Sequence, residues 1–147
     1  METLTFSDIL KAEDPALSEP VERIFDAKGK PFNVKFRTDC ATDADAFYQA
    51  CGIVSKYVAG ITVQPIKVVF PGVKTFEITN PLYIGELELV SFLVIEPKMN
   101  IEQWAVAGKK FGPQFIKVIS MTGATLNHLN DPAKVELDPK GPIPNES

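Results

Sequence analysis

The chain has 147 residues, of which 45% are hydrophobic and 23% charged, so it can form one globular domain with a buried core. Its 15 basic and 19 acidic residues give a net charge of −4, which argues against nucleic-acid binding through a basic surface. The single histidine excludes a His-rich metal site. Cys40 and Cys51 form no Cys-x-x-Cys pair, and we expect both to be free thiols.

The N-terminal part of the chain predicts a short helix followed by a β-hairpin. The helix covers Thr5–Glu13, and the spacing of Thr5 and Asp8 is close to that of a capping box. Phe32, Val34 and Phe36 alternate with polar residues, which is typical of a half-buried strand. Because a glycine-containing break separates this run from Val21–Phe25, the two runs indicate an antiparallel hairpin.

A longer helix and a second hairpin are expected in the middle of the chain. Thr42 is an N-cap residue type, and the helical pattern runs from there to about Val58. The segments Ile66–Phe70 and Val73–Ile78 are rich in β-branched and aromatic residues, with the turn signal Pro71-Gly72 between them. We therefore expect two strands joined by a tight turn.

The strongest predicted helix is Asn80–Glu96, which begins with an Asn-Pro capping pair and ends before Pro97. It is apolar on nearly all sides, which predicts a central, buried position in the fold. Its most apolar stretch, Leu82–Ile95, is shorter than the roughly 18–20 residues needed to span a bilayer, so it predicts a core helix and not a membrane anchor.

Two further helices follow. The first covers Asn100–Ala107, with Gln103 placed to complete a capping box and Gly108 expected to end the helix. The second runs from Gly112-Pro113 to about Leu126, and its predicted inward residues are Phe115, Ile116, Ile119 and Thr122. Altogether the pattern predicts an α+β fold, with small antiparallel hairpins packed on a helical bundle. One domain is expected over residues 1–129, followed by a flexible, proline-rich tail over residues 130–147.

No catalytic signature is present in the sequence, and we expect neither an enzyme nor a cofactor-binding or metal-binding protein. Asp39, Asp43 and Asp45 lack the pattern of a calcium loop and fit the start of a helix better. Glu86 and Glu88 are two positions apart on a helix, so they point to different faces and do not form an acid/base pair. The sequence likewise indicates no small-molecule substrate.

Trp104 and Phe111 are the aromatic residues with two open interpretations. Each belongs either to the core or to an exposed apolar patch that binds a partner. Between them, Lys109 and Lys110 precede the predicted start of the last helix. These lysines lie either in a weak anion site at that helix N-terminus or in an ordinary loop between two helices.

The order of three segments resembles the small tail assembly chaperones of long-tailed bacteriophages. The segments are Phe6–Asp14, then Phe32–Thr38 leading into the helix start Thr42–Phe47, and last Leu89–Met99 with the two helices after it. The likeness covers the chain up to about residue 50 and again from Asn80 to Leu126. Because Lys56–Ile78 has no counterpart, a structural protein of the tail or virion is the alternative.

This resemblance implies a non-enzymatic protein of the host-cell cytoplasm that acts in several copies. Its partner would be the long, helical tape measure protein, which it keeps soluble while the tail tube polymerises, and self-association is expected as well. For the contact with this client, the first candidates are Trp104, Phe111 and Phe115, with Lys109 and Lys110 at the rim.

Overall fold

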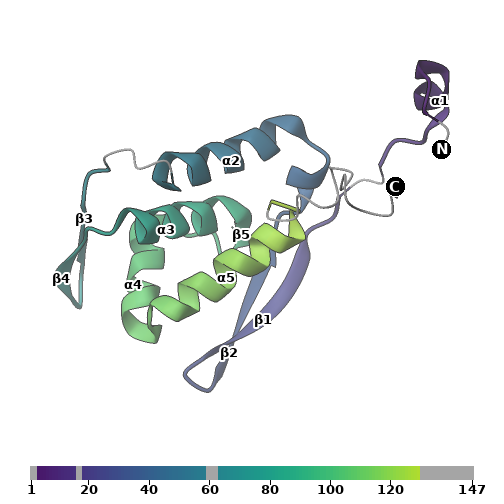
Figure 1. Ribbon diagram of the computed structural model, residues 1–147. Coiled ribbons are helices and arrows are strands. Elements are labelled where there is room, and N and C mark those ends of the chain that lie inside the picture. Colours follow the sequence, from purple (N-terminus) through teal and green to yellow (C-terminus); the bar gives the residue numbers. More distant parts are fainter. Residues whose placement is uncertain (1–2, 16–17, 59–62, 130–147) are drawn as a thin grey trace, which may run out of the picture.

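Figure 1 shows the fold in a computed structural model, which describes residues 3–15, 18–58 and 63–129. Within those ranges, helices and strands are interspersed along the chain, and the strands form two separate antiparallel sheets. The fold is therefore mixed α+β, as the sequence predicts. In chain order the elements are α1 (Phe6–Lys11), β1 (Val21–Ala27), β2 (Lys30–Phe36), the 3₁₀ turn η1 (Asp39–Ala41), α2 (Ala44–Val58), β3 (Ile66–Phe70), β4 (Val73–Ile78), α3 (Pro81–Leu93), β5 (Val94–Glu96), α4 (Ile101–Phe111) and α5 (Pro113–Leu126).

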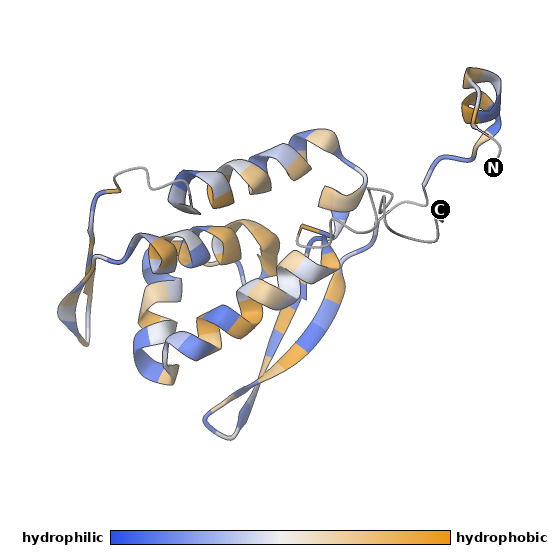
Figure 2. Ribbon diagram, viewed as in Figure 1, coloured by the Kyte–Doolittle hydropathy of each residue, from blue (hydrophilic) through white to orange (hydrophobic). Residues whose placement is uncertain are grey.

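The larger sheet has the order β1–β2–β5 and turns one face toward the helices. β1 and β2 form the predicted hairpin, with Arg23 directly opposite Val34. Its two-residue turn has positive φ angles at Lys28 (54°) and Gly29 (87°), which suits the right-handed twist of the strands. Figure 2 shows bands of hydrophobic and hydrophilic residues along both strands. The face that carries Val34 and Phe36 is buried, and the opposite face is solvated.

The helix predicted over Asn80–Glu96 ends earlier than its sequence suggests. It begins as predicted, because Asn80 Oδ1 accepts a hydrogen bond from the backbone N–H of Leu82 at 2.9 Å. It stops at Leu93, and Val94–Glu96 pairs with β2 as strand β5. The predicted end is wrong because the β-branched residues of this segment gain backbone hydrogen bonds to a strand that lies far away in the sequence.

α3 occupies the centre of the helical layer, as predicted. It packs against α2, α4 and α5, and α5 lies between α3 and the β1–β2 hairpin (Figure 1). Two glycines allow these close approaches. A Cβ atom on Gly85 would lie 2.7 Å from the ring of Tyr57 in α2, and one on Gly123 would lie 3.0 Å from Phe36 and Leu93. Larger residues at either position would push the layers apart.

α4 continues past the glycine that was expected to end it. The predicted capping box is present, with the backbone N–H of Gln103 donating to Asn100 Oδ1 at 2.8 Å. Gly108 lies inside the helix and is buried against the Tyr83 hydroxyl and Ile116. The prediction that Gly108 ends α4 is wrong, because this packing outweighs the cost of about 1 kcal/mol that glycine carries in a helix.

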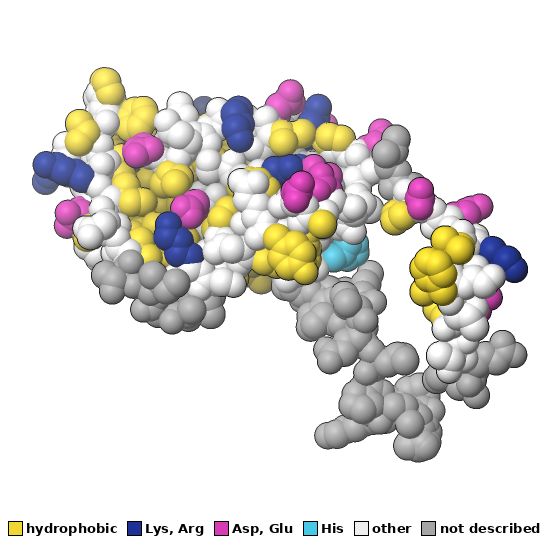
Figure 3. All heavy atoms as spheres, turned by 90° about the horizontal axis from the view of Figure 1, so that it is seen from above, with side chains coloured by type: hydrophobic (Ala, Val, Ile, Leu, Met, Phe, Trp, Pro, Cys, Tyr) yellow, Lys and Arg dark blue, Asp and Glu magenta, His cyan; other side chains and the backbone are white. Residues whose placement is uncertain are grey.

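α1 stands apart from the rest of the molecule in Figures 1 and 3. Its predicted capping box is present, since Asp8 N donates to Thr5 Oγ1 at 3.2 Å and Thr5 N donates to Asp8 Oδ2 at 3.0 Å. No residue of α1 is buried, and Phe6 and Leu10 are 72% and 70% exposed. Figure 3 shows hydrophobic side chains gathered on this helix. α1 therefore forms without a cover for its apolar face.

The remaining structural expectations concern the cysteines, the tail and the membrane. Cys40 and Cys51 are both free, as predicted. The tail predicted for residues 130–147 lies outside the described residues. In the described part of the chain, no helix combines the length and the apolar character needed to cross a bilayer.

Candidate functional site

The aromatic residues predicted to contact a partner lie mostly in the core. Trp104 is 0% exposed, and its ring meets that of Phe32 edge-on with the centroids 6.1 Å apart. Phe115 is 8% exposed and also packs edge-on against Phe32, at 5.5 Å. Of the two interpretations open for Trp104, the structure shows core burial. The expectation that Trp104 and Phe115 present their rings to a client is corrected accordingly.

The other three predicted residues belong to the last turn of α4 and not to a loop. At this end of the helix, the positive charges of Lys109 and Lys110 interact favourably with the partial negative charge of the helix dipole. The Lys109 Nζ lies 5.1 Å from the centroid of the Phe76 ring in β4, so this lysine contacts the second hairpin. Phe111 is 37% exposed and stacks on Phe115 with the centroids 5.0 Å apart. Among the predicted aromatics, only Phe111 offers substantial apolar surface.

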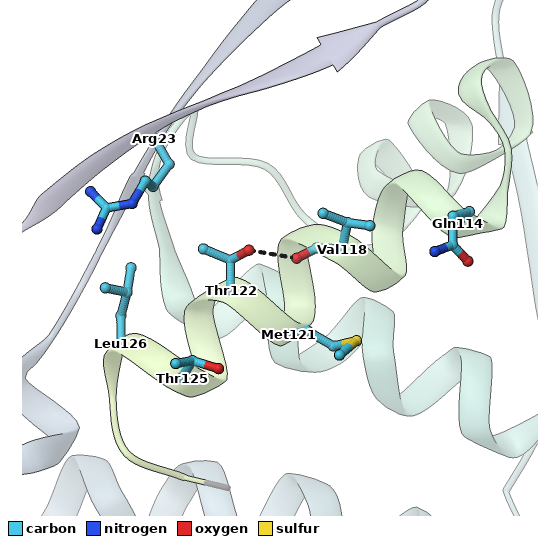
Figure 4. A pocket seen from close by; sticks show the side chains of 7 residues that line it. All are labelled: Arg23, Gln114, Val118, Met121, Thr122, Thr125 and Leu126. Atoms are coloured by element: carbon cyan, nitrogen blue, oxygen red, sulfur yellow. Dashed lines mark hydrogen bonds between the residues drawn. The ribbon is translucent and has the colours of Figure 1, made fainter. Parts of the chain in front are cut away.

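Phe111 lies at one end of a groove between α5 and β1, which we call the α5–β1 groove. Its larger hollow has a volume of about 530 Å³, and Figure 4 shows Arg23 of β1 on one side and α5 on the other. The adjoining hollow, of about 340 Å³, shares Gln114 and Val118 with the first and is lined by Phe111. The α5 residues of the larger hollow are Gln114, Val118, Met121, Thr122, Thr125 and Leu126.

The α5 side of this groove is mainly apolar. Val118 is 40% exposed and Met121 is 53% exposed, and together with Leu126 they follow one side of the helix. The Thr122 hydroxyl donates to the carbonyl oxygen of Val118 at 2.8 Å, so its hydrogen bond is made within α5. At a rise of 1.5 Å per residue, the distance from Gln114 to Leu126 is about 18 Å, which matches about three turns of a second helix.

Arg23 marks the place where the sheet is not fully covered. It pairs with the buried Val34 and alternates with Val21 and Phe25, so it belongs to the face of β1 that turns toward the helices. Charged residues on such a face are rarely buried without a partner. In the structure Arg23 is exposed, and its Nη1 donates to the backbone carbonyl of Glu22 at 3.0 Å. The helices therefore leave this part of the face open, and the groove is the result.

Sequence reasoning missed this groove although two signals for it exist. The predicted inward face of α5 is confirmed for Phe115, Ile116 and Ile119, which are buried, but not for Thr122, which lines the groove. The groove residues Gln114, Val118, Met121 and Thr125 form a neighbouring stripe at positions i, i+4, i+7 and i+11. The second signal is an arginine at an inward position of a strand. Together they indicate that α5 has an apolar side that the domain itself does not cover.

The two glutamates of α3 point to different surroundings, as predicted. Glu86 lines a hollow of about 470 Å³ between α3 and α5, together with Tyr83 and Lys117. Burial raises the pKa of the Glu86 carboxyl, and Lys117 acts in the opposite direction. Glu88 instead accepts a hydrogen bond from the Tyr57 hydroxyl of α2 at 2.8 Å. These two carboxyl groups do not form an acid/base pair.

Replacing Tyr57 by phenylalanine should remove a tyrosine whose pKa is raised by the fold. Burial, followed by the hydrogen bond to Glu88, raises the pKa of Tyr57 from 10.0 to about 12. Because the pKa is higher in the folded state, the stability linked to this hydroxyl is fully present below pH 10 and is lost as the pH rises to about 12. Absorbance titration and denaturant unfolding across this pH range measure both effects. The exposed Tyr48→Phe is the matched control, and an equal pH dependence in the wild type and Tyr57→Phe would contradict the prediction.

The acidic cluster performs the helix-start role that the sequence indicates. Asp43, rather than the predicted Thr42, caps α2, since its Oδ1 accepts from the backbone N–H of Asp45 at 2.9 Å. Asp39 forms an ion pair with Arg37 at 2.7 Å, and the Arg37 guanidinium lowers the pKa of that carboxyl. Within residues 3–15, 18–58 and 63–129, no three His, Cys, Asp or Glu side chains are arranged to hold a metal ion.

Comparison with known proteins finds no matching family model, no matching curated protein and no matching solved structure.

Proposed function

We propose that this protein is a non-enzymatic tail assembly chaperone of a long-tailed bacteriophage. It acts in the cytoplasm of the host cell, where it binds the tape measure protein and keeps it soluble during tail assembly. The contact is made by the α5–β1 groove, which receives the apolar face of a client helix. No cofactor and no nucleic acid takes part in this function. The observation that supports the proposal is the uncovered groove along α5, in which Val118 and Met121 expose apolar side chains.

The shape and chemistry of the groove suit a helix. An amphipathic helix binds an apolar groove through side chains at positions i, i+3, i+4 and i+7. Val118 and Met121 supply exposed apolar surface along the groove, and Phe111 extends it at the N-terminal end of α5. A long helical protein with repeated apolar faces would offer many such segments. Several copies of this chain could therefore bind along one client, as the resemblance to tail assembly chaperones implies.

Met121→Asp should weaken client binding about thirtyfold or more, because it places a charge in the middle of the groove. The change should leave the fold intact, since the Met121 side chain is 53% exposed. Co-expression with the tape measure protein of the same phage, followed by purification of the complex and a binding titration, measures the effect. The matched control is Val69→Asp, which changes a 65% exposed aliphatic residue on the distant β3–β4 hairpin. Equal binding by both variants would reject the groove as the client site.

A structural protein of the tail or virion is the alternative function. The β3–β4 hairpin, which lies at one end of the fold in Figure 1, belongs to the segment that has no counterpart in the chaperone likeness. Such a hairpin could contact neighbouring subunits in an assembled particle. Mass spectrometry of purified particles separates the two functions, because a structural protein remains in the particle and a chaperone is absent from it.

A further inference from the structure

The N-terminal helix has an apolar face with nothing to cover it. Phe6, Ile9 and Leu10 lie at helical spacing on one side of α1 and are 72%, 55% and 70% exposed, and Leu4 just before the helix is 74% exposed. A helix of this length is not stable alone in water and normally depends on packing of its apolar side. The Thr5–Asp8 capping box nevertheless defines where it begins. α1 is therefore a short, preformed apolar segment that needs an acceptor surface.

The α5–β1 groove has the complementary properties. It is an uncovered apolar surface on the same chain. Arg23 is the ionisable residue that lines its larger hollow, and Asp26 lines the adjoining one. Among the described residues, no carboxylate lies within ion-pair distance of Arg23. The segment that contains α1, residues 3–15, has a net charge of −2, from Asp8, Glu13 and Asp14 against Lys11. The apolar side of α1 thus suits the apolar groove, and the net negative charge of its segment is opposite to that of Arg23.

The chain just before β1 is held beside the segment that leads into α2. Ser18 Oγ lies 3.1 Å from Thr42 Oγ1, and the Thr38 hydroxyl donates to the carbonyl oxygen of Glu19 at 2.8 Å. These bonds hold the chain just before β1 against the segment that leads into α2. α1 itself is separate from the body in both views (Figures 1 and 3).

We infer that α1 of one copy docks in the α5–β1 groove of a second copy. The donor and acceptor surfaces differ, so the contact is head-to-tail, and an open chain of copies keeps one free groove at one end and one free α1 at the other. Copies then associate into rings or short chains. The inference rests on the proposed function in one respect, because a client helix would bind the same groove and displace α1.

Two full-length variants with complementary defects test this exchange of α1 between copies. Phe6→Asp damages α1 and leaves the groove intact, whereas Met121→Asp damages the groove and leaves α1 intact. In sedimentation velocity, the wild type should associate as its concentration rises, and each variant alone should stay monomeric. An equimolar mixture should form dimers and nothing larger, since it contains one intact α1 and one intact groove. Ser7→Asp, which adds the same charge on another side of α1, and Val69→Asp should both associate like the wild type.

Three results would overturn the inference. A wild type that stays monomeric at all concentrations would show that α1 does not bind the groove of another copy. Variants that associate like the wild type would place the contact elsewhere, and a mixture that stays monomeric would exclude the exchange. Client binding separates this inference from the proposed function. If Met121→Asp loses the client and the wild type is monomeric, the client site stands and the exchange between copies fails.

Discussion

Replacing Trp104 by alanine should lower the free energy of unfolding by about 3–5 kcal/mol, the range observed for removal of a large buried aromatic ring. Trp104 is fully buried, and its ring packs edge-on against Phe32 of β2. Its removal would leave a cavity between α4 and the sheet that neighbouring side chains fill only in part. Urea unfolding followed by circular dichroism measures the change, because the chain has only one tryptophan and its fluorescence is lost in the variant.

Trp104→Phe is the control that separates ring volume from the indole nitrogen. Among the described residues, no acceptor is available to the buried Nε1 of Trp104. Phenylalanine keeps most of the aromatic packing and removes this unpaired donor, so its loss of stability should be much smaller. If Trp104→Ala remained as stable as the wild type and bound the client less tightly, the tryptophan would be a surface contact and the buried position described above would be incorrect.

Replacing Asn127 by alanine should lower the free energy of unfolding by about 2–4 kcal/mol, because it leaves a buried backbone N–H and a partly buried backbone carbonyl without their partner. Asn127 is fully buried just after α5. Its Oδ1 accepts from the backbone N–H of Cys40 at 3.2 Å, and its Nδ2 donates to the carbonyl oxygen of Arg37 at 2.9 Å. One side chain thus connects the end of α5 to the end of β2 and to η1. Denaturant unfolding measures the loss.

Asn127→Asp provides a pH-dependent version of the same test. The new carboxylate can still accept from Cys40 but would face the carbonyl oxygens of Arg37 and Gly123, which need a donor. Protonation is therefore favoured in the folded state, so this variant should be closest to the wild type in acid and lose stability as the pH rises. The exposed Asn33→Ala should change stability by no more than about 0.5 kcal/mol. A pH-independent defect in Asn127→Asp would contradict this account.

The parts of the fold that depend on residues close together in the sequence could be predicted. The caps at Thr5, Asn80 and Asn100 and the hairpin β3–β4 are local chemistry, and all of them are present. β5 could not be predicted, because its partner strand lies more than fifty positions earlier in the chain and its own residues continue an apolar helical pattern. Gly108 likewise lies inside α4 because of a tertiary contact with Tyr83, although glycine has a low helix propensity.

The candidate site could be predicted only in part. The sequence indicates the aromatic residues around Phe111 as partner contacts because of their size. Size alone does not distinguish a core position such as Trp104 from an exposed one. Phe111 does border the α5–β1 groove, but its main apolar surface comes from Val118 and Met121. These residues were missed because the predicted inward face of α5 accounted for its strongest apolar stripe. Only the position of β1 in the fold shows that a second side of α5 stays exposed to solvent.

The hydrogen bonds of Asn127 also have a consequence for folding during synthesis. They join residues that are 87 and 90 positions apart, and α5 completes the cover of the apolar face of the β1–β2 hairpin, to which Trp104 of α4 also contributes. The hairpin leaves the ribosome well before α5 is made, so the cover of Val34 and Phe36 stays incomplete during the translation of α2, α3 and α4. Long-range closure of this kind slows folding, and exposed strands aggregate in the interval. The nascent chain is thus itself prone to aggregate, and slower synthesis of the segment before α5 would lower its soluble yield.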